Sequence, residues 1–360
     1  MSAVYAIGSN GSGQLGIGHK EDVSVPKPVI FMSTSPKEIA QVKAGGNHTL
    51  ILGSENLYCS GDTLTGACGS NTEYKSTESL FREVSYSFGD HNYKPKVVFC
   101  AASWESSVVV VKDENGKATK AYTFGTGNKG ELGLGGFLFR SSKAQLLKDF
   151  PPPGLEIVDL AASVSHVVAV LSNGEVYGWG SGRKGQLSQP EGIIYVPRKL
   201  SGIDFKAIRA VCGREFTYVV GDTALGQHCI LGSEKWDIKA AAPLDVSGWK
   251  DIGATWGSIF VLLESGKLLS WGRDDHGQLA PPGLPILQKI AIGSEHALGL
   301  ASDGDVLAWG WGEHGNCGPN TTNGDVKGKW NIIASSKYLP AESKISNIGA
   351  GCATSWVCTS

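Results

Sequence analysis

Apolar residues recur along the chain in short runs of strand length, and glycines or small polar residues end nearly every run. One pattern is an apolar strand ending in glycine, then a polar turn, then Gly-Gln-Leu or a variant of it, as in VYGWGSGRKGQL from position 176. The other is two apolar strands joined by a small-residue turn, as in IAIGSEHALGL from position 290. Neither pattern has the period of a helix, so the chain predicts an all-β protein.

The two patterns alternate, and each occurs seven times, with one degenerate copy of the first at CILGSEKWD. Repeats of about 50 residues are typical of solenoids and propellers, and four-stranded blades in a ring account for the several strands in each repeat. We predict one seven-bladed β-propeller over residues 1–360, although length alone favours two domains. The glycines that end the first-pattern strands are Gly8, Gly61, Gly125, Gly180, Gly232, Gly272 and Gly310.

The two ends of the chain predict how the ring closes. Inside the chain, a second-pattern strand is followed by a first-pattern strand across a short hairpin turn, as in residues 171–180 and 301–310. The chain begins with a first-pattern strand, Val4–Gly8, and ends with a second-pattern strand at 354–358. Pairing of these two strands in one blade would remove the exposed edges of an open sheet.

Composition and charge argue against several classes of function. Glycine accounts for 49 of 360 residues, and 32 Lys and Arg residues nearly balance 34 Asp and Glu residues. Without a basic excess or a basic tail, direct DNA binding is not expected. The N-terminus lacks the pattern of a signal peptide, and the apolar runs are far shorter than the ~20 residues of a membrane helix. We expect no export, no membrane contact and a location in cytoplasm and nucleus.

The eight cysteines form no C-x-x-C pair and mostly lie in apolar strand patterns. We expect them to be reduced and buried, as in a cytosolic or nuclear protein. His314 and Cys317 could be two metal ligands, but no second pair stands at a metal-like spacing, and Cys317 occupies the leucine place of Gly-Gln-Leu. We predict that the chain binds no metal or other cofactor.

Three segments match the G-x-G-x-x-G fingerprint of dinucleotide-binding proteins, at 125–130, 180–185 and 310–315. A true fingerprint opens a helix, whereas strand or loop residues follow here and the motif recurs with the repeat. We interpret it as a turn whose middle position adopts a left-handed backbone. Residues at that position are Asn10, Gly127, Gly182, Asp274 and Gly312.

Nothing in the chain predicts catalysis. His48, His166 and His296 occupy one equivalent position after the small-residue turn. A histidine repeated in this way is expected to hydrogen-bond the backbone of a neighbouring blade rather than to act as a base. No G-x-S-x-G nucleophile elbow stands between a strand and a helix. We therefore predict that the protein is not an enzyme.

Propellers carry function in the turns of one face, around the mouth of the channel. Trp104 and Trp256 lie in two of the small-residue turns, and tryptophan is enriched at binding hot spots. We predict that they bind a partner; the alternative is that they plug the channel mouth. Trp311 lies in a turn just beyond Trp309, which we expect to be buried.

Three longer connections, at residues 70–95, 137–154 and 320–342, interrupt the period. Long surface insertions cost little free energy, so drift in loop length explains them. The alternative is that one of them embraces a partner.

The repeat resembles that of the regulator of chromosome condensation family over essentially the whole chain, most specifically in VYGWGSGRKGQL and VLAWGWGEHGNCG. It is similar in particular to a fungal branch, the alpha-tubulin suppressors linked to killer-toxin insensitivity. That similarity lies in VYAIGSNGSGQLGIGH, AGGNHTLIL, AIGSEHALGL, WGWGEHGNCGP and GAGCATSWV. It implies a non-enzymatic heterodimer with a small metal-binding (zinc or iron) protein of diphthamide synthesis. The pair would serve tRNA wobble-uridine modification by the Elongator complex and diphthamide formation on translation elongation factor two.

The turns of the resembled proteins carry a similar set of side chains, which supports Trp104, Arg214, Trp256, Glu295 and His296 as contacts. The full set of predicted partner-binding residues is Trp104, Glu105, Arg214, Trp256, Glu295, His296, Trp311, Glu313 and His314.

Two other functions stay open. The first is guanine-nucleotide exchange on a small nuclear GTPase, the activity of the founding family member. The second is a generic interaction scaffold. An exchange factor of that kind should also touch chromatin, and the near-neutral charge argues against such contact. Periodicity alone reaches only a seven-bladed interaction propeller.

Overall fold

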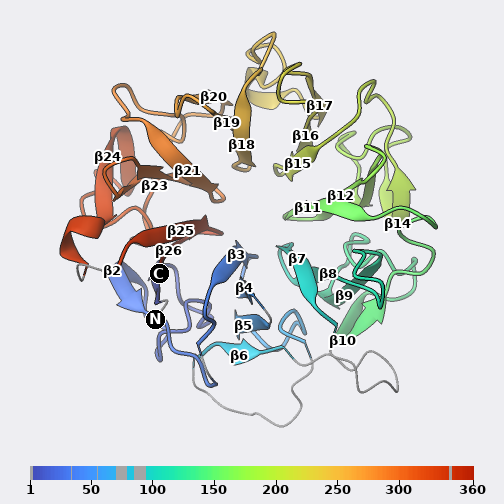
Figure 1. Ribbon diagram of the computed structural model, residues 1–360, viewed down its shortest axis with the longest axis horizontal. Helices are drawn as coiled ribbons and strands as arrows, with labels where there is room; N and C mark the ends of the chain where they lie inside the picture. The colour runs from blue at the N-terminus through green and yellow to red at the C-terminus, as the bar shows by residue number, and fades with distance from the viewer. Residues whose placement is uncertain (1–2, 34, 55, 70–78, 85–94, 340–342) are drawn as a thin grey trace.

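Seven antiparallel sheets stand in a ring around a central channel (Figure 1). The structure is a computed structural model that describes residues 3–33, 35–54, 56–69, 79–84, 95–339 and 343–360. In each sheet the first strand lies nearest the channel and the later strands lie progressively outward (Figure 1). The predicted all-β seven-bladed propeller is confirmed.

Blade 1 closes the ring and contains both termini, which lie side by side (Figure 1). Its strands, from the channel outward, are β25 (Ile345–Ala350), β26 (Thr354–Thr359), β1 (Val4–Gly8) and β2 (Val23–Pro28). Strands β1 and β26 pair antiparallel from Val4 opposite Cys358 to Gly8 opposite Thr354. The predicted pairing of the two ends is therefore observed residue for residue.

Four of the other blades also have four strands. Blade 2 comprises β3 (Ile39–Ala44), β4 (His48–Gly53), β5 (Leu57–Gly61) and β6 (Arg82–Glu83), and blade 3 comprises β7 (Val97–Ala102), β8 (Ser106–Val111), β9 (Lys120–Thr126) and β10 (Arg140–Leu146). Blade 4 comprises β11 (Ile157–Ser163), β12 (His166–Leu171), β13 (Val176–Ser181) and β14 (Ile193–Lys199). Blade 7 comprises β21 (Leu287–Ile292), β22 (His296–Ala301), β23 (Asp305–Trp311) and β24 (Asp325–Ser335), followed by the 3₁₀ turn η2 (Ser336–Tyr338).

Blades 5 and 6 have three strands each within the described residues, which corrects the expectation of four-stranded blades throughout. Blade 5 has β15 (Arg209–Cys212), β16 (Phe216–Val220) and β17 (His228–Gly232), then the 3₁₀ turn η1 (Lys235–Asp237). Blade 6 has β18 (Trp249–Ala254), β19 (Ser258–Leu263) and β20 (Leu268–Gly272). In blade 6 the segment after β20 holds Pro281, Pro282 and Pro285, which cannot donate to a fourth-strand ladder.

The core lies between neighbouring blades, where buried faces of adjacent sheets pack together. Trp179 and Trp309 are fully buried there, as predicted for Trp309. Each donates its indole N–H to a backbone carbonyl in the loop of the preceding blade, Glu131 at 2.9 Å and Gln278 at 3.0 Å. A hydrogen-bonded tryptophan at each of these junctions fixes one blade against the next.

The turn interpretation of the glycine fingerprints needs one correction. The left-handed backbone is adopted by the strand-ending glycines, such as Gly180 with φ +101°, and not by the middle position. At the middle position there is no room for most side chains, because a Cβ on Gly312 would lie 2.9 Å from the Cβ of Cys317. Where the position is polar, as at Asn10, the side chain instead accepts the backbone N–H of Leu15 at 3.0 Å.

Candidate functional site: the channel mouth

The small-residue turns that join the first and second strands lie together around one mouth of the channel, on what we call the mouth face. Backbone hydrogen bonds tie five of these turns to the turn of the next blade. Trp104 N donates to Val164 O at 3.1 Å, and Trp256 N donates to Ser294 O at 2.8 Å. These bonds across blade boundaries hold the side chains of the mouth in fixed relative positions.

Trp104 of blade 3 and Trp256 of blade 6 come from opposite sides of the ring and meet over the mouth. Their ring centroids are 6.0 Å apart with an interplanar angle of 46°. The guanidinium of Arg214 lies 5.4 Å from the ring centroid of Trp256. Both indoles line the channel, and Trp104 still exposes 38 % of its surface. The pair therefore spans the mouth, as the plugging alternative proposed, and also offers aromatic surface to solvent.

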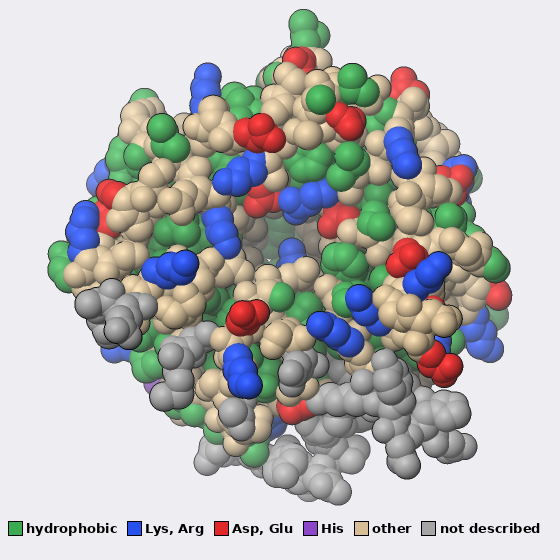
Figure 2. All heavy atoms as spheres, viewed as in Figure 1, with side chains coloured by type: hydrophobic (Ala, Val, Ile, Leu, Met, Phe, Trp, Pro, Cys, Tyr) green, Lys and Arg blue, Asp and Glu red, His purple; other side chains and the backbone are tan. Residues whose placement is uncertain are grey.

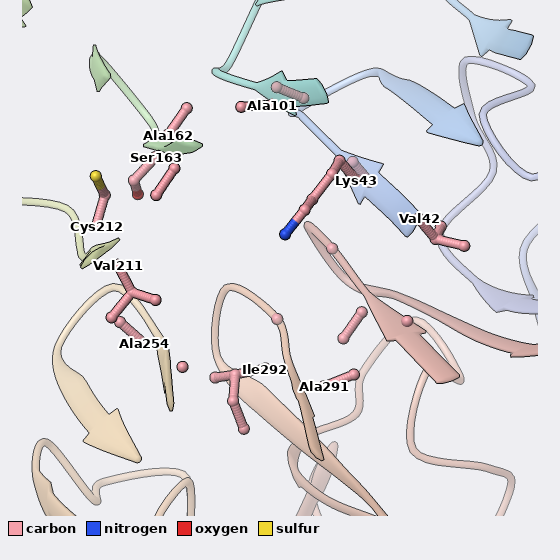
Figure 3. A pocket seen from close by; sticks show the side chains of 18 of the residues that line it. Val42, Lys43, Ala101, Ala162, Ser163, Val211, Cys212, Ala254, Ala291 and Ile292 are labelled. Carbon is pink, nitrogen blue, oxygen red and sulfur yellow. The ribbon is translucent and has the colours of Figure 1, made fainter. Parts of the chain in front are cut away.

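Below this pair the channel is a cavity of about 370 Å³, lined mostly by small residues of the innermost strands. Lys43 points into it (Figure 3). Arg209 donates to Asp251 at 2.5 Å and lies 4.0 Å from Asp159. Burial raises the pKa of Asp159, and the charge of Arg209 opposes that shift. Charged side chains also surround the central opening on the face that Figure 2 shows.

Glu295 and His296 lie inside the protein, which corrects their placement among the exposed contacts of the mouth. Glu295 exposes 5 % of its surface and accepts hydrogen bonds from Arg273 at 2.5 Å and from Gln278 at 2.8 Å. Burial raises the pKa of Glu295, and the hydrogen bond from Gln278 and the positive charge of Arg273 oppose that shift. His296 exposes none of its surface. Neither side chain lies on the surface of the mouth face.

The three equivalent histidines each bond a hydroxyl of the next blade, and His166 and His296 also interact with the backbone of that blade, at Phe216 and Thr354, as predicted. Nε2 of His48 lies 2.9 Å from the hydroxyl of Ser107 in the next blade, and that hydroxyl donates to the carbonyl of Ala67 at 2.7 Å. Because the hydroxyl proton is used, Nε2 of His48 must be the donor. His166 with Thr217 and His296 with Ser355 repeat the arrangement at 3.1 and 2.9 Å.

Trp311, Glu313 and His314 form a second group on the mouth face, farther from the channel in blade 7. Trp311 packs edge-on against His314 with centroids 5.4 Å apart, and Nδ1 of His314 lies 2.7 Å from a carboxylate oxygen of Asp22. Glu313 is exposed, and Trp311 is half-buried. Glu105 lies half-buried beside Trp104. Apart from the buried Glu295 and His296, the structure thus brings the predicted residues into two groups, at the mouth and on blade 7.

The described residues contain no group of three or more His, Cys, Asp and Glu side chains placed to hold a metal ion. Cys317 is fully buried in the core, as its position in the leucine place predicts. The expectation that all cysteines are reduced is wrong for one pair, because Cys59 and Cys68 form a disulfide.

Two of the three long connections are used as blade structure. Residues 137–154 contain β10, and residues 320–342 contain β24 and η2. Most of the connection 70–95 lies outside the described residues, as do 340–342, so its suggested contact with a partner stays a prediction.

Sequence reasoning missed two residues of the mouth face. Trp236 follows the degenerate repeat copy, and its ring lies 5.2 Å from the guanidinium of Arg273. Trp236 exposes 52 % of its surface. The signal available was a tryptophan in the turn after the third strand of the blade that carries Arg214, but the weak repeat there concealed its position.

The fold and the site define the class: a seven-bladed propeller with a rigid aromatic surface over one mouth of its channel. The model of the RCC1-like domain matches residues 3–357, so the chain belongs to that family. An RCC1 repeat-containing protein of Schizosaccharomyces pombe is 32% identical, with 98% of each chain covered. A secretion-regulating guanine nucleotide exchange factor of Bos taurus is 25% identical over 77% of this chain and 61% of its own.

Among solved structures, Prp20p of Saccharomyces cerevisiae superposes with a TM-score of 0.79 at 20% identity, covering 99% of this chain and 91% of that one. This likeness establishes the shared fold. In the part of the chain that the structure covers, no helix is long and apolar enough to cross a membrane.

Proposed function

We propose that this chain is a non-enzymatic adaptor that binds a protein partner on its mouth face. The observation that carries the proposal is the contact of Trp104 with Trp256 over the channel, with Arg214 stacked on it. Tryptophan and arginine are the residues most enriched in binding hot spots. Rigid turns present them, so little entropy is lost when a partner docks.

The partner we propose is a small zinc- or iron-binding protein of diphthamide synthesis, which would form a heterodimer with this chain. The fungal sequence resemblance supports this choice. Through that heterodimer the chain would support Elongator-dependent tRNA wobble-uridine modification and diphthamide formation on elongation factor two, in cytoplasm and nucleus. The proposal does not include direct binding to DNA.

Titration calorimetry of Trp104→Ala and Trp256→Ala against this metalloprotein tests the proposal. We expect each variant to bind about thirtyfold more weakly, since truncating a hot-spot residue costs ~2 kcal/mol or more. Because the two indoles pack on each other, the double variant should lose less than the sum of the two single losses. Circular dichroism checks that each variant remains folded.

The matched control is Leu244→Ala, because Leu244 is fully exposed and the adjacent Asp245 lies against Gly226, in the hairpin at the opposite ends of the strands. It should bind like wild type. If both folded tryptophan variants also bind like wild type, the mouth face is not the docking surface.

The second candidate is guanine-nucleotide exchange, which the name of the bovine relative supports. Release of labelled GDP from a small nuclear GTPase, measured with and without this chain, distinguishes the two. Acceleration well above the spontaneous rate would favour exchange, and an unchanged rate together with metalloprotein binding would favour the adaptor.

A further inference from the structure

Trp236 has an unusual combination of exposure and backbone conformation. It lies in η1 with φ +63° and ψ +25°, the left-handed region, and half of its surface faces solvent. A positive φ is a genuine outlier for a bulky residue. Such conformations persist only where the surroundings hold them, and they cluster at functional sites.

The surroundings that hold Trp236 are two elements of blade 6. Its indole stacks on Arg273, which donates to Asp275 at 2.7 Å and to the buried Glu295 at 2.5 Å. Gly257 leaves room beneath both side chains: a Cβ there would lie 3.3 Å from Cδ1 of Trp236 and 2.9 Å from Cβ of Arg273. Glu295 thus holds Arg273 in place, and Arg273 in turn holds the exposed indole of Trp236.

The same segment is joined to the mouth. Lys235 makes an ion pair of 3.0 Å with Glu215, the residue after Arg214. Gly257, beneath Trp236, follows Trp256 directly in the chain. Arg214, Trp256 and Trp236 therefore form one continuous surface across blades 5 and 6. We call this surface, together with Lys235 and Arg273, the Trp236 ledge.

The charges of the ledge are not equally satisfied. Arg273 is neutralised by two carboxylates, and Lys235 by one. Arg214 is exposed and stacks on Trp256, and within the described residues it makes no ion pair. A carboxylate arriving at this surface would therefore find its partner in Arg214, beside two indole faces.

We propose that Trp236 is a further anchor for the protein partner, and that the ledge takes an acidic segment of that partner. A carboxylate of the segment pairs with Arg214, and a neighbouring apolar side chain packs on the indoles of Trp256 and Trp236. Glu295 and Arg273 are positioning residues that hold the indole of Trp236. This assignment rests on the proposed function and names where the partner lies.

The decisive variant is Trp236→Gly, titrated against the diphthamide-synthesis metalloprotein. Glycine adopts the left-handed backbone freely, so the variant should melt at the wild-type temperature or above it while binding about thirtyfold more weakly. Leu244→Ala serves again as the exposed apolar control. If Trp236→Gly binds like wild type while wild type binds tightly, the ledge is not a contact and the proposed function survives. If wild type itself does not bind, the proposed function fails.

The carboxylate contact is tested by the salt dependence of binding. Replacing Arg214 by Ala should weaken binding and flatten the fall of affinity with rising NaCl, because exposed charges are screened by salt. An unchanged salt dependence would overturn the acidic-segment assignment.

The positioning role is tested by a double-mutant cycle. Glu295→Gln should weaken binding in the wild-type background and have no further effect once Trp236 is glycine. Equal losses in both backgrounds would mean that Glu295 acts independently of Trp236. Should Glu295→Gln not fold, Arg273→Gln at the half-buried end of the same pair provides the same comparison.

Discussion

His48, His166 and His296 show how a single repeated side chain can serve architecture. Each is fully buried, and its Nε2–H bonds a hydroxyl of the next blade. Burial lowers the pKa of each imidazole to about 4, because the charged form would lose its hydration. The folded protein therefore keeps these rings neutral at pH values where the unfolded chain protonates them.

This difference predicts acid sensitivity of stability. Between about pH 6.5 and 4 the unfolded state binds more protons, so the free energy of unfolding should fall as the pH falls. His166→Gln keeps an N–H donor close to the position of Nε2 but cannot titrate. Denaturant unfolding at several pH values should show that this variant takes up about one proton fewer than wild type when it unfolds in this pH range. A slope identical to wild type would contradict the assignment.

At the scale of elements, the Gly-Gln-Leu loops are fastened by their glutamine. The side-chain oxygen of Gln186 accepts the N–H of Lys184 at 2.8 Å, and Gln278 accepts that of His276 at 2.9 Å. Blade 2 has Ala67 in the glutamine place, and Cys68 in the leucine place is bonded to Cys59 of β5. In this loop the disulfide replaces the hydrogen bond of the glutamine. The same loop contacts blade 3, because the carbonyl of Ala67 accepts a hydrogen bond from the hydroxyl of Ser107.

We predict that reduction loosens this junction. Dithiothreitol should lower the free energy of unfolding by about 2–3 kcal/mol, the loss expected for a loop of this length. The control is Cys59→Ala with Cys68→Leu, the small-plus-leucine pair that Ala6 and Leu15 form in blade 1. Thermal unfolding of that variant should not respond to dithiothreitol. A wild-type melting temperature equal with and without reductant would contradict the prediction.

At the scale of the whole molecule, blade 1 joins the two ends of the chain and closes the ring. Its two inner strands come from the C-terminal end of the chain and its two outer strands from the N-terminal end. Besides the β1–β26 ladder, the N–H of Thr359 donates to the carbonyl of Ala3 at 2.9 Å. Opening this blade would expose strand edges, the usual templates for aggregation.

Deletion of residues 352–360 should therefore cause aggregation or a large fall in melting temperature. Removal of Ser360 alone, which is exposed, should change little. Size-exclusion chromatography and calorimetry measure both effects. A deletion variant as monomeric and heat-stable as the full chain would contradict closure by blade 1.

The sequence by itself determined the number of blades, the closing pair of strands and the burial of Trp309. These features follow from local alternation of apolar residues and from glycines at fixed offsets, which each repeat specifies on its own. It also selected Trp104 and Trp256, because tryptophan in a small-residue turn is poor core material.

Only the tertiary structure decided which side chains meet. Trp104 and Trp256 lie in blades far apart in the chain, and ring closure alone brings their indoles to 6.0 Å. From the sequence, Glu295 is predicted to lie on the surface, because it is a charged residue in a turn. In the structure it is buried against Arg273. Trp236 belongs to a repeat that has lost its pattern, so its place on the mouth face depends on packing against Gly257 rather than on any period.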